Sequence, residues 1–431
     1  MSENFEELRL KKLEFLLILI ISVLLLGFRV YVASNLRQLG VFDQYNVFFD
    51  SDPNQYVSAI SGGWGFGRSI HPAFALLINI PVRVFDYLAA HAGILEVGAV
   101  RGGAPLLVSP FFTSVAGILW WLAARKSGFS RLAGVAGFLL LQFSFSQTVF
   151  SVIPESYGVS GALLAALLLF VVTAARRPET LTNARVRARW LFLACLMSGV
   201  TVTNGFLCLA VWFAIRVKRE NIRMVIAEVI VAGIVLGCVI AAMGATDRMV
   251  YRPVQAANSK SGVEVKVWVE KYLTPSVARR FVEVPAVFVA SVFTIGVTQV
   301  ENTVAKTENR HQFQFSFVRL LESKTFVAFG WIFIAGLGEL VWRKDRGAVL
   351  TRAIAAIFIF NITLHTFFGL EVFLYSQHWL AFLTFAMILP VSGSRSKTSI
   401  LILLILVLAG FSLSFNTWLG MHEALNSSVA I

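Results

Sequence analysis

The chain has 431 residues, of which 57% are hydrophobic and only 14% are charged, and its mean hydropathy is +0.75. This composition excludes an ordinary soluble domain, in which roughly 25% of residues are charged. The excess of 37 lysines and arginines over 24 aspartates and glutamates lies mainly in short loops between apolar runs, which is typical of membrane proteins and argues against a nucleic-acid partner.

The first apolar run, Leu13 to Val32, contains only two charged residues, Glu14 and Arg29. It is long enough to cross a hydrocarbon core, which needs about 20 residues. The "VYVAS" that follows resembles a signal-peptide cleavage site, but the run exceeds the usual apolar region of about 7 to 15 residues. We therefore expect an uncleaved first helix, with Arg29 extending outward to the headgroups.

Further apolar runs of helical length recur along the chain. They predict an all-α, polytopic transmembrane bundle of about 10 to 13 helices, half-helices included, in one integral membrane domain, 1–431. Within it we expect a helical module (1–245) with an outer loop at 35–71, an outer polar loop (246–312) and C-terminal helices (313–431). The runs are Ala73–Leu88, Pro105–Ala123, Leu132–Val149, Tyr157–Thr173, Leu191–Ile215, Met224–Met243, Pro285–Val297, Phe326–Trp342, Ala353–Phe368, Val372–Val391 and Ile400–Trp418.

Basic loops predict the sides of the membrane, because such loops are usually cytoplasmic. The N-terminus is then cytoplasmic, and the first loop and the polar loop face outward. These assignments hold only if the run Leu191–Ile215 enters the membrane and returns to the same side. The break "TVTNG" at Thr201–Gly205 would then join two half-helices; a single kinked helix is the alternative. For the same reason, one of the two runs between Ala73 and Ala123 must not cross the membrane. The basic loops are Arg176–Arg189, Arg216–Asn221, Trp342–Arg346 and Ser392–Lys397, and Ala124–Arg131 has the same character.

In the polar loop, Val263–Leu273 alternates apolar and charged residues, which favours a strand or an extended segment. Pro285–Val297 is too short to cross and is predicted to be interfacial. The three cysteines, Cys195, Cys208 and Cys238, lie in apolar runs without metal-ligand spacing, so we expect buried free thiols.

The first outer loop holds two carboxylates in "VFFDSDPNQYVSAI", Asp50 and Asp52. Asp52 followed by Pro53 is a typical helix start, with the aspartate as the cap. Capping explains one carboxylate but not two. Nor does it explain the glycine-rich "GGWGFGRSIHP" that follows, with Arg68 and His71. The loop is therefore a candidate site.

These features resemble the GT-C glycosyltransferases, polytopic enzymes that use polyprenyl-phosphate sugars and carry acidic residues in their first outer loop. The resemblance rests on the loop's position, on Asp52 with Tyr56 four residues later, on the His71-Pro72 pair, and on "PESY" at Pro154–Tyr157. Many members have adjacent acidic residues, whereas Ser51 separates the two here. Which aspartate is the base therefore stays open.

The resemblance implies transfer of a sugar from a lipid-linked donor in the bilayer to a glycan, lipid or protein acceptor of the cell envelope at the outer face. The acceptor hydroxyl must lose a proton, and Asp52 is the first candidate base, with Asp50 the second. An Asp-x-Asp pair is alternatively a ligand set for a divalent cation such as Mg²⁺ or Mn²⁺; no other cofactor is expected. The departing phosphate needs cations, for which the candidates on the same side are Arg68, His71, Arg248 and Arg252.

Two other segments contain candidate substrate-binding residues. Glu155 and Tyr157 are expected in an outer loop, where they orient the acceptor or form an exposed polar turn. In "EVFLYSQHW", Glu371 and His378 are expected to face a cavity, since ionisable residues in membrane segments are costly. Tyr375, a further candidate, and Trp379 also suit interface anchors.

Arg83 and Asp86, three residues apart, are predicted to pair on one helix face in a structural role.

Two other functions compete with glycosyl transfer. A transporter or flippase of lipid-linked saccharides would also have broken helices and intramembrane charge, but it predicts an internal symmetry that the sequence lacks. A glycan ligase or polymerase would use an arginine-rich outer loop, and Arg248, Arg252, Arg279 and Arg280 occupy such a loop.

Overall fold

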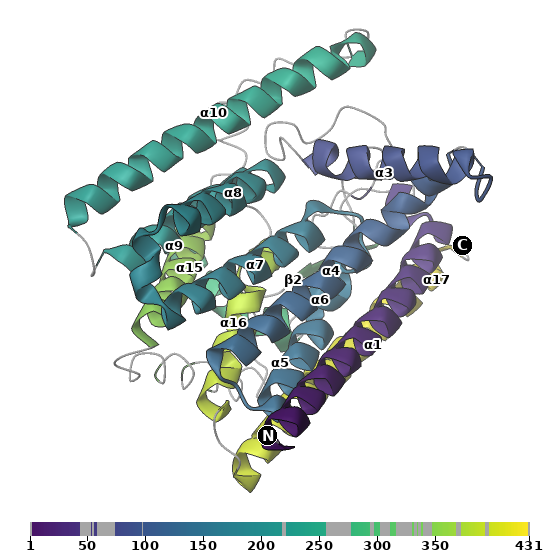
Figure 1. Ribbon diagram of the computed structural model, residues 1–431. Coiled ribbons are helices and arrows are strands. Elements are labelled where there is room, and N and C mark those ends of the chain that lie inside the picture. The colour runs from purple at the N-terminus through teal and green to yellow at the C-terminus, as the bar shows by residue number, and fades with distance from the viewer. Residues whose placement is uncertain are drawn as a thin grey trace.

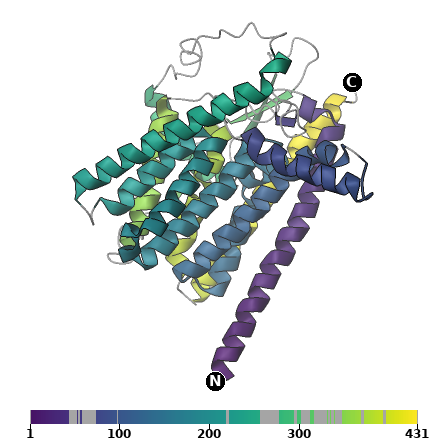
Figure 2. The same ribbon diagram turned by 45° about the horizontal axis from the view of Figure 1, so that its top comes forward.

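The fold is a bundle of long helices whose axes run in broadly similar directions, with α3 lying across one end (Figures 1 and 2). The computed structural model describes residues 2–43, 53, 56–57, 74–96, 98–217, 221–255, 277–293, 297–301, 311–315, 330–331, 334, 338, 347–367, 372–392 and 396–429.

Thirteen α-helices lie within these described ranges, together with four short 3₁₀ helices and one two-stranded ribbon. The α-helices are α1 (Ser2–Gln38), α3 (Phe74–His91), α4 (Ala99–Ser127), α5 (Arg131–Phe143), α6 (Phe145–Phe150), α7 (Ser156–Arg176), α8 (Ala184–Val200), α9 (Val202–Arg216), α10 (Ile222–Gln255), α12 (Val277–Phe293), α15 (Gly347–Phe367), α16 (Leu380–Ile388) and α17 (Lys397–Val429). The other elements are η1 (Val41–Asp43), η2 (Pro178–Thr182), η3 (Val372–His378), η4 (Leu389–Val391), β1 (Val297–Glu301) and β2 (His311–Phe315).

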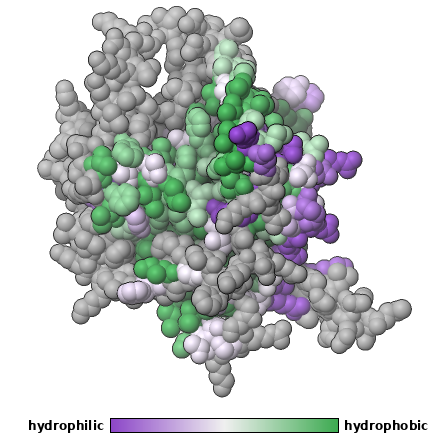
Figure 3. All heavy atoms as spheres, turned by 90° about the vertical axis from the view of Figure 1, so that its left-hand side faces the viewer, coloured by the Kyte–Doolittle hydropathy of each residue, from purple (hydrophilic) through white to green (hydrophobic). Residues whose placement is uncertain are grey.

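Six of the described helices are long and apolar enough to cross a membrane. These helices keep large hydrophobic side chains on the surface, and green hydrophobic atoms cover much of the described face in Figure 3. A soluble protein would bury such surface, so the chain is a multi-pass membrane protein. The six segments are Lys12–Gln38, Ala99–Ser127, Ser156–Arg176, Ile222–Met243, Val349–Phe367 and Thr398–Glu423.

Helix α1 buries only a narrow stripe of its surface. The two charged residues of its apolar run, Glu14 and Arg29, both face the protein interior. Glu14 accepts a hydrogen bond from Trp121 Nε1 at 3.0 Å and pairs with Arg125 at 3.1 Å. Arg29 is 4% exposed and donates to the backbone oxygen of Gln142 at 3.0 Å. The expectation that Arg29 extends outward is therefore wrong, because its guanidinium turns into the bundle, toward the carbonyl of Gln142 and the hydroxyl of Thr113.

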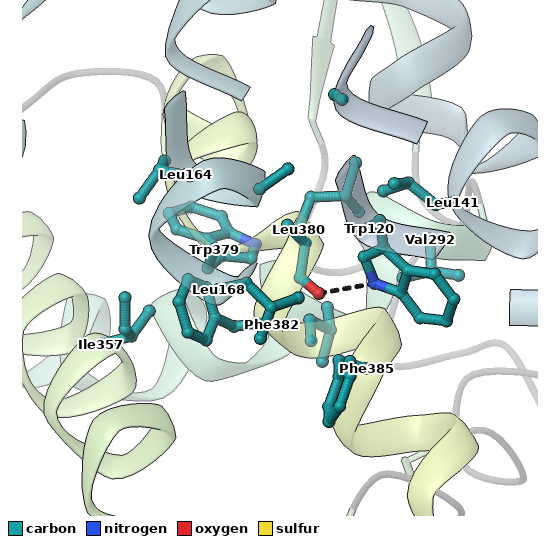
Figure 4. Close-up of a cluster of buried hydrophobic side chains, with 14 of the residues drawn as sticks. Trp120, Leu141, Leu164, Leu168, Val292, Ile357, Trp379, Leu380, Phe382 and Phe385 are labelled. Atoms are coloured by element: carbon teal, nitrogen blue, oxygen red, sulfur yellow. Dashed lines mark hydrogen bonds between the residues drawn. The ribbon is translucent and has the colours of Figure 1, made fainter. Parts of the chain in front are cut away.

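The core is built on aromatic residues from helices that are far apart in the sequence (Figure 4). Trp120 of α4 is fully buried and donates its Nε1–H to the backbone oxygen of Ala381 in α16 at 2.9 Å. Its ring lies edge-on to Phe385, with centroids 5.8 Å apart. A buried indole that lacked this acceptor would be costly, so the bond holds Trp120 in one position.

Helices α8 and α9 form a hairpin, as the break at Thr201–Gly205 predicted. Thr201 is extended (φ −150°, ψ 118°) and is the single residue between the two helices. Trp190 and Trp212, equally far from Thr201 in sequence, stack with centroids 4.4 Å apart. A Cβ on Gly205 would lie 1.8 Å from Ser198 Oγ, so glycine permits the close approach at the tip. At 17 and 15 residues, each arm rises about 22 to 26 Å, short of a full crossing of about 30 Å.

Helix α3 bears on the second conflict over membrane crossings, because it lies across one end of the bundle and is not among the six candidate spans (Figures 1 and 2). Its Asp86 accepts hydrogen bonds from the amides of Gly98 and Val100 and from Arg101 Nε at 2.9 Å, and so caps the start of α4. The structural role expected of Asp86 is confirmed. The partner found for its carboxylate is Arg101 of the next helix, whereas the sequence pointed to Arg83.

The Asp86 cap predicts a pH dependence of stability. Burial raises the pKa of Asp86, but hydrogen bonds from Arg101 and from the amide of Gly98 outweigh this effect and lower the pKa overall. A carboxyl whose pKa is depressed on folding stabilises the protein fully above its ordinary pKa of about 3.9 and loses that contribution as the pH falls through the folded value. Asp86→Asn should therefore lower the melting temperature in detergent at pH 7, and the difference from wild type should shrink below about pH 4. Glu96→Gln, at an exposed position, is the control; a difference independent of pH would contradict the assignment.

The described parts of the predicted basic loops gather at one end of the bundle, whereas Trp342–Arg346 lies outside the described residues. Ser130 N donates to Ser392 O at 2.8 Å, which joins the start of α5 to the segment before α17. Arg352 near the start of α15 donates to Ile215 O at the end of α9. The stacked tryptophans place the open end of the α8–α9 hairpin here as well. The described parts of these loops thus share one end, as a single cytoplasmic side requires.

The opposite end, called the site end below, gathers the end of α1, the starts of α4 and α7 and the tip of the α8–α9 hairpin. Arg37 donates to Gly102 O at 2.8 Å, which joins α1 to α4. Ser160 Oγ and Thr201 Oγ1, 3.3 Å apart, join α7 to the hairpin tip.

The region expected to be an outer polar loop, 246–312, differs from that expectation in three ways. Helix α10 continues to Gln255, β1 and β2 pair antiparallel, and α12 is buried along its C-terminal half, from Val284 to Phe293 except for Pro285. The interfacial assignment of Pro285–Val297 is therefore wrong up to Phe293, because these side chains pack against α15, η3 and α16. Val263–Leu273, expected to be extended, lies outside the described residues.

Candidate functional site

The candidate site forms around the start of α7, where an irregular segment runs through the protein interior. Ile153, Glu155 and Ser156 are at most 2% exposed. Buried irregular backbone needs hydrogen-bond partners, and Ser109 of α4 supplies them. Its hydroxyl donates to Ile153 O at 2.6 Å and accepts from Glu155 N at 3.4 Å. The interpretation of "PESY" as an exposed polar turn is therefore wrong.

Glu155 occupies the N-cap position of α7, with extended backbone (φ −139°, ψ 166°). The start of a helix carries partial positive charge from its unpaired amides, which favours a nearby carboxylate. A buried glutamate at this position suits binding or proton transfer better than surface solvation.

Tyr56, from the segment expected to form the first outer loop, contacts this irregular segment. It is 4% exposed, and its hydroxyl lies 3.4 Å from Ser156 Oγ. Its ring packs edge-on against Phe74, with centroids 5.3 Å apart, and Val200 at the hairpin tip belongs to the same small core. The structure thus brings Tyr56 to Glu155 and Tyr157, as a shared site requires.

Tyr157 of α7 meets Tyr375 and His378, which in turn contact His365, and these four residues form what we call the Tyr157 cluster. Tyr157 lies 6.2 Å from Tyr375 and 6.3 Å from His378, between ring centroids. His365 stacks on Tyr375 at 4.5 Å. Both histidines are 1% exposed, and Tyr157 is 7% exposed.

The interface-anchor interpretation of the 371–379 segment is not supported. Tyr375 packs into the Tyr157 cluster, and Trp379 is fully buried, with its Nε1 donating to Ser291 Oγ of α12 at 3.3 Å. The apolar run Val372–Val391 is not one helix but is divided into η3, α16 and η4.

The polar residues of η3 explain this division, because they find partners inside the bundle. Gln377 Nε2 donates to Ser146 Oγ of α6 at 2.8 Å, and Ser146 and Ser376 share a hydrogen bond between their hydroxyls. A Cβ on Gly161 of α7 would lie 2.5 Å from Gln377 Oε1. Glycine therefore lets α7 approach η3 closely.

Sequence reasoning missed His365, Gln377 and Ser146. His365 had a usable signal, since it interrupts the apolar run Ala353–Phe368 and intramembrane ionisable residues usually face a cavity or a partner. Ser146 had none, because a single serine in an apolar run marks no site, whereas Gln377 belongs to the polar segment 371–379 that the sequence had already marked. Their roles depend on which helices become neighbours.

Several predicted site residues lie outside the described residues: Asp50, Asp52, Arg68, His71 and Glu371. Arg248 and Arg252 belong to the last part of α10, but their side chains are not described.

Among the described residues, no group of three or more histidines, cysteines, aspartates or glutamates is placed to hold a metal ion. The predicted ligands, Asp50 and Asp52, are not part of that set. The cysteines are free, but only Cys208 is buried, whereas Cys238 is exposed.

The site therefore combines a buried carboxyl group, three phenols and two imidazoles around the start of one helix. Such groups exchange protons and donate hydrogen bonds to phosphate or hydroxyl oxygens. No protein-family model matches this chain, and no curated protein is significantly similar to it. The fold and the site define a multi-pass membrane protein with a polar centre inside its helical bundle.

Proposed function

We propose that this protein is a membrane glycosyltransferase that moves a sugar from a polyprenyl-phosphate donor to an acceptor hydroxyl at the site end. The observation that carries the proposal is the convergence of Tyr56, Glu155, Tyr157, Tyr375 and His378 around the start of α7. These residues come from three separate segments that the sequence had marked for the same chemistry.

The proposed reaction needs a base and a phosphate-binding group. Asp52, or Asp50 in its place, takes the proton of the acceptor hydroxyl while that oxygen forms a bond to the anomeric carbon. The bond between this carbon and the phosphate oxygen breaks, and the polyprenyl phosphate leaves with the electron pair. The proposal includes the roles predicted for five further residues. The basic ones stabilise the negative charge on the departing phosphate, and the acidic one binds substrate. These residues are Arg68, His71, Arg248, Arg252 and Glu371. A divalent cation held by Asp50 and Asp52 is the alternative role for those residues.

Within the described residues, Tyr56 and Glu155 suit the positioning of the acidic loop, and the Tyr157 cluster suits donation of hydrogen bonds to phosphate or sugar. The carrier lipid enters from the bilayer, which suits a site inside a bundle of membrane-spanning helices. The acceptor is a glycan, a lipid or a protein that presents a hydroxyl at the outer surface.

The test is a transfer assay with purified protein in liposomes. Polyprenyl-phosphate monosaccharides and polyprenyl-diphosphate oligosaccharides are supplied separately with a mixture of envelope acceptors, and a fluorescent analogue monitors lipid flipping. Transfer from the monosaccharide donor supports the proposal. Transfer from the oligosaccharide donor alone would identify a ligase or polymerase, and flipping without transfer would identify a transporter, which the α8–α9 hairpin also suits.

Replacement of Glu155 tests the described part of the site. Glu155→Gln keeps the shape of the side chain but removes its charge, and we expect transfer to fall by about 10- to 100-fold, as misplacement of reacting groups commonly causes. Glu179→Gln, at an exposed position in η2, is the matched control. Equal activity of the two variants would remove Glu155 from the site.

A further inference from the structure

A cavity of about 290 Å³ lies between α1, α17 and the α5–α6 segment, and we call it the Arg29 cavity. Its walls are mainly apolar and include Phe28, Phe143 and Phe415, while Arg29 and Gln142 supply polar groups. The volume is at the lower end of the roughly 300 to 1,000 Å³ typical of ligand sites. Among the described residues that line it, none belongs to the Tyr157 cluster.

Arg29 is a buried cation whose hydrogen-bond partners are neutral. Its guanidinium donates to Gln142 O at 3.0 Å and lies 3.5 Å from Thr113 Oγ1. No carboxylate in the described part of the chain forms an ion pair with it, whereas Glu14 on the same helix pairs with Arg125. Burial of an uncompensated charge at membrane depth is costly, so two neutral acceptors leave the site short of an anion.

Gln142 also lines the cavity, but its side-chain amide turns toward α4. Its Nε2 donates to Thr113 O at 3.1 Å, and its Oε1 is fully buried, so a molecule in the cavity does not reach that oxygen. The cavity thus offers one buried cation beside aromatic walls.

A phosphate monoester fits this combination. Its oxygens accept from the planar guanidinium fork, which matches phosphate geometry. A hydrocarbon chain suits the phenylalanine walls and the bilayer beside α1 and α17. A free phosphate ion would leave those apolar walls without a partner.

We propose that the Arg29 cavity binds an anionic membrane lipid, with the lipid phosphate against Arg29 and a chain between α1 and α17. This proposal does not depend on the proposed glycosyltransferase activity.

The test measures lipid retention by native mass spectrometry and melting temperature in dodecyl maltoside. The probes are dioleoyl phosphatidic acid, dioleoyl phosphatidylcholine and inorganic phosphate. Wild type should retain phosphatidic acid about 10-fold more strongly than phosphatidylcholine, since a buried arginine–phosphate pair favours the anion. Only phosphatidic acid should raise the melting temperature.

Arg29→Gln should abolish this preference, Arg29→Lys should keep part of it, and Arg223→Gln, at an exposed site on α10, should change nothing. Should Arg29→Gln fail to fold, Leu25→Trp fills the cavity and leaves Arg29 in place; it should also lose the retained lipid. Equal retention of the two lipids by wild type, or undiminished retention of phosphatidic acid by Leu25→Trp, would overturn the proposal. Stabilisation by inorganic phosphate alone would overturn it too.

Discussion

Asp52→Asn is expected to lower sugar transfer by about 100-fold or more, the range over which general-base catalysis usually acts. Asparagine has nearly the shape of aspartate but cannot accept the proton of the acceptor hydroxyl. Asp50→Asn is the informative comparison, because the sequence leaves open which aspartate is the base. The measurement is the rate of product formation from the lipid-linked monosaccharide in liposomes, normalised to the amount of inserted protein.

The two variants distinguish the roles of the acidic pair. If one aspartate is the general base, only the variant that replaces it loses transfer activity. If the two aspartates hold a metal ion, both variants lose activity, and excess Mg²⁺ or Mn²⁺ restores it. Wild-type melting temperatures would show that the fold is intact, with Tyr56 still available to anchor the loop. Full activity of both variants would remove the acidic loop from the mechanism and, with it, the main basis of the resemblance to GT-C enzymes.

Gly137→Ala should have a large effect on stability. A Cβ at this position would lie 2.0 Å from Trp120 Cη2 and 2.6 Å from Cζ3. Trp120 is fully buried and is held by its hydrogen bond to Ala381 O, so the ring cannot move aside. We expect a loss of about 1 to 3 kcal/mol in the free energy of unfolding, the usual cost of overpacking a core. The measurement is reversible unfolding in detergent micelles.

Gly237→Ala on α10 is the matched control, because no atom lies within 4 Å of the Cβ it would add. That variant should be neutral or stabilising by up to about 1 kcal/mol, since alanine favours a helix over glycine. Combining Gly137→Ala with Trp120→Phe should recover part of the loss, with a coupling energy of about 1 kcal/mol or more. Strictly additive effects would show that the two residues do not meet.

The number of membrane crossings shows how far sequence reasoning reached. Basic loops together with run lengths required the Leu191–Ile215 run to turn back, and the Trp190–Trp212 stack confirms that it does. The same reasoning required one run before Ala123 not to cross, and α3 lies across one end of the bundle, in line with that expectation (Figures 1 and 2). Both inferences rest on the large cost of burying loop charges in a bilayer compared with local preferences.

Segments whose position depends on other helices were predicted less well. The C-terminal half of α12 reads as an interfacial segment by length, yet it lies in the core, because α15, η3 and α16 surround it. Arg29 was expected to reach the headgroups, and it turns inward to the carbonyl of Gln142. Hydropathy cannot distinguish these outcomes, since it measures the preference of one segment for lipid over water and carries no information about packing against neighbouring helices.

Hydropathy and charge along the chain were enough to indicate several membrane crossings and to locate most of the apolar helices. These properties follow from transfer of side chains between water and hydrocarbon, which each segment undergoes almost independently. The meeting of Tyr56, Glu155 and the Tyr157 cluster at the start of α7, and the position of Arg29 beside a cavity, depend instead on how the helices pack. Such contacts join residues about 100 to 220 positions apart, and they form only when helices pack and their buried polar groups find partners.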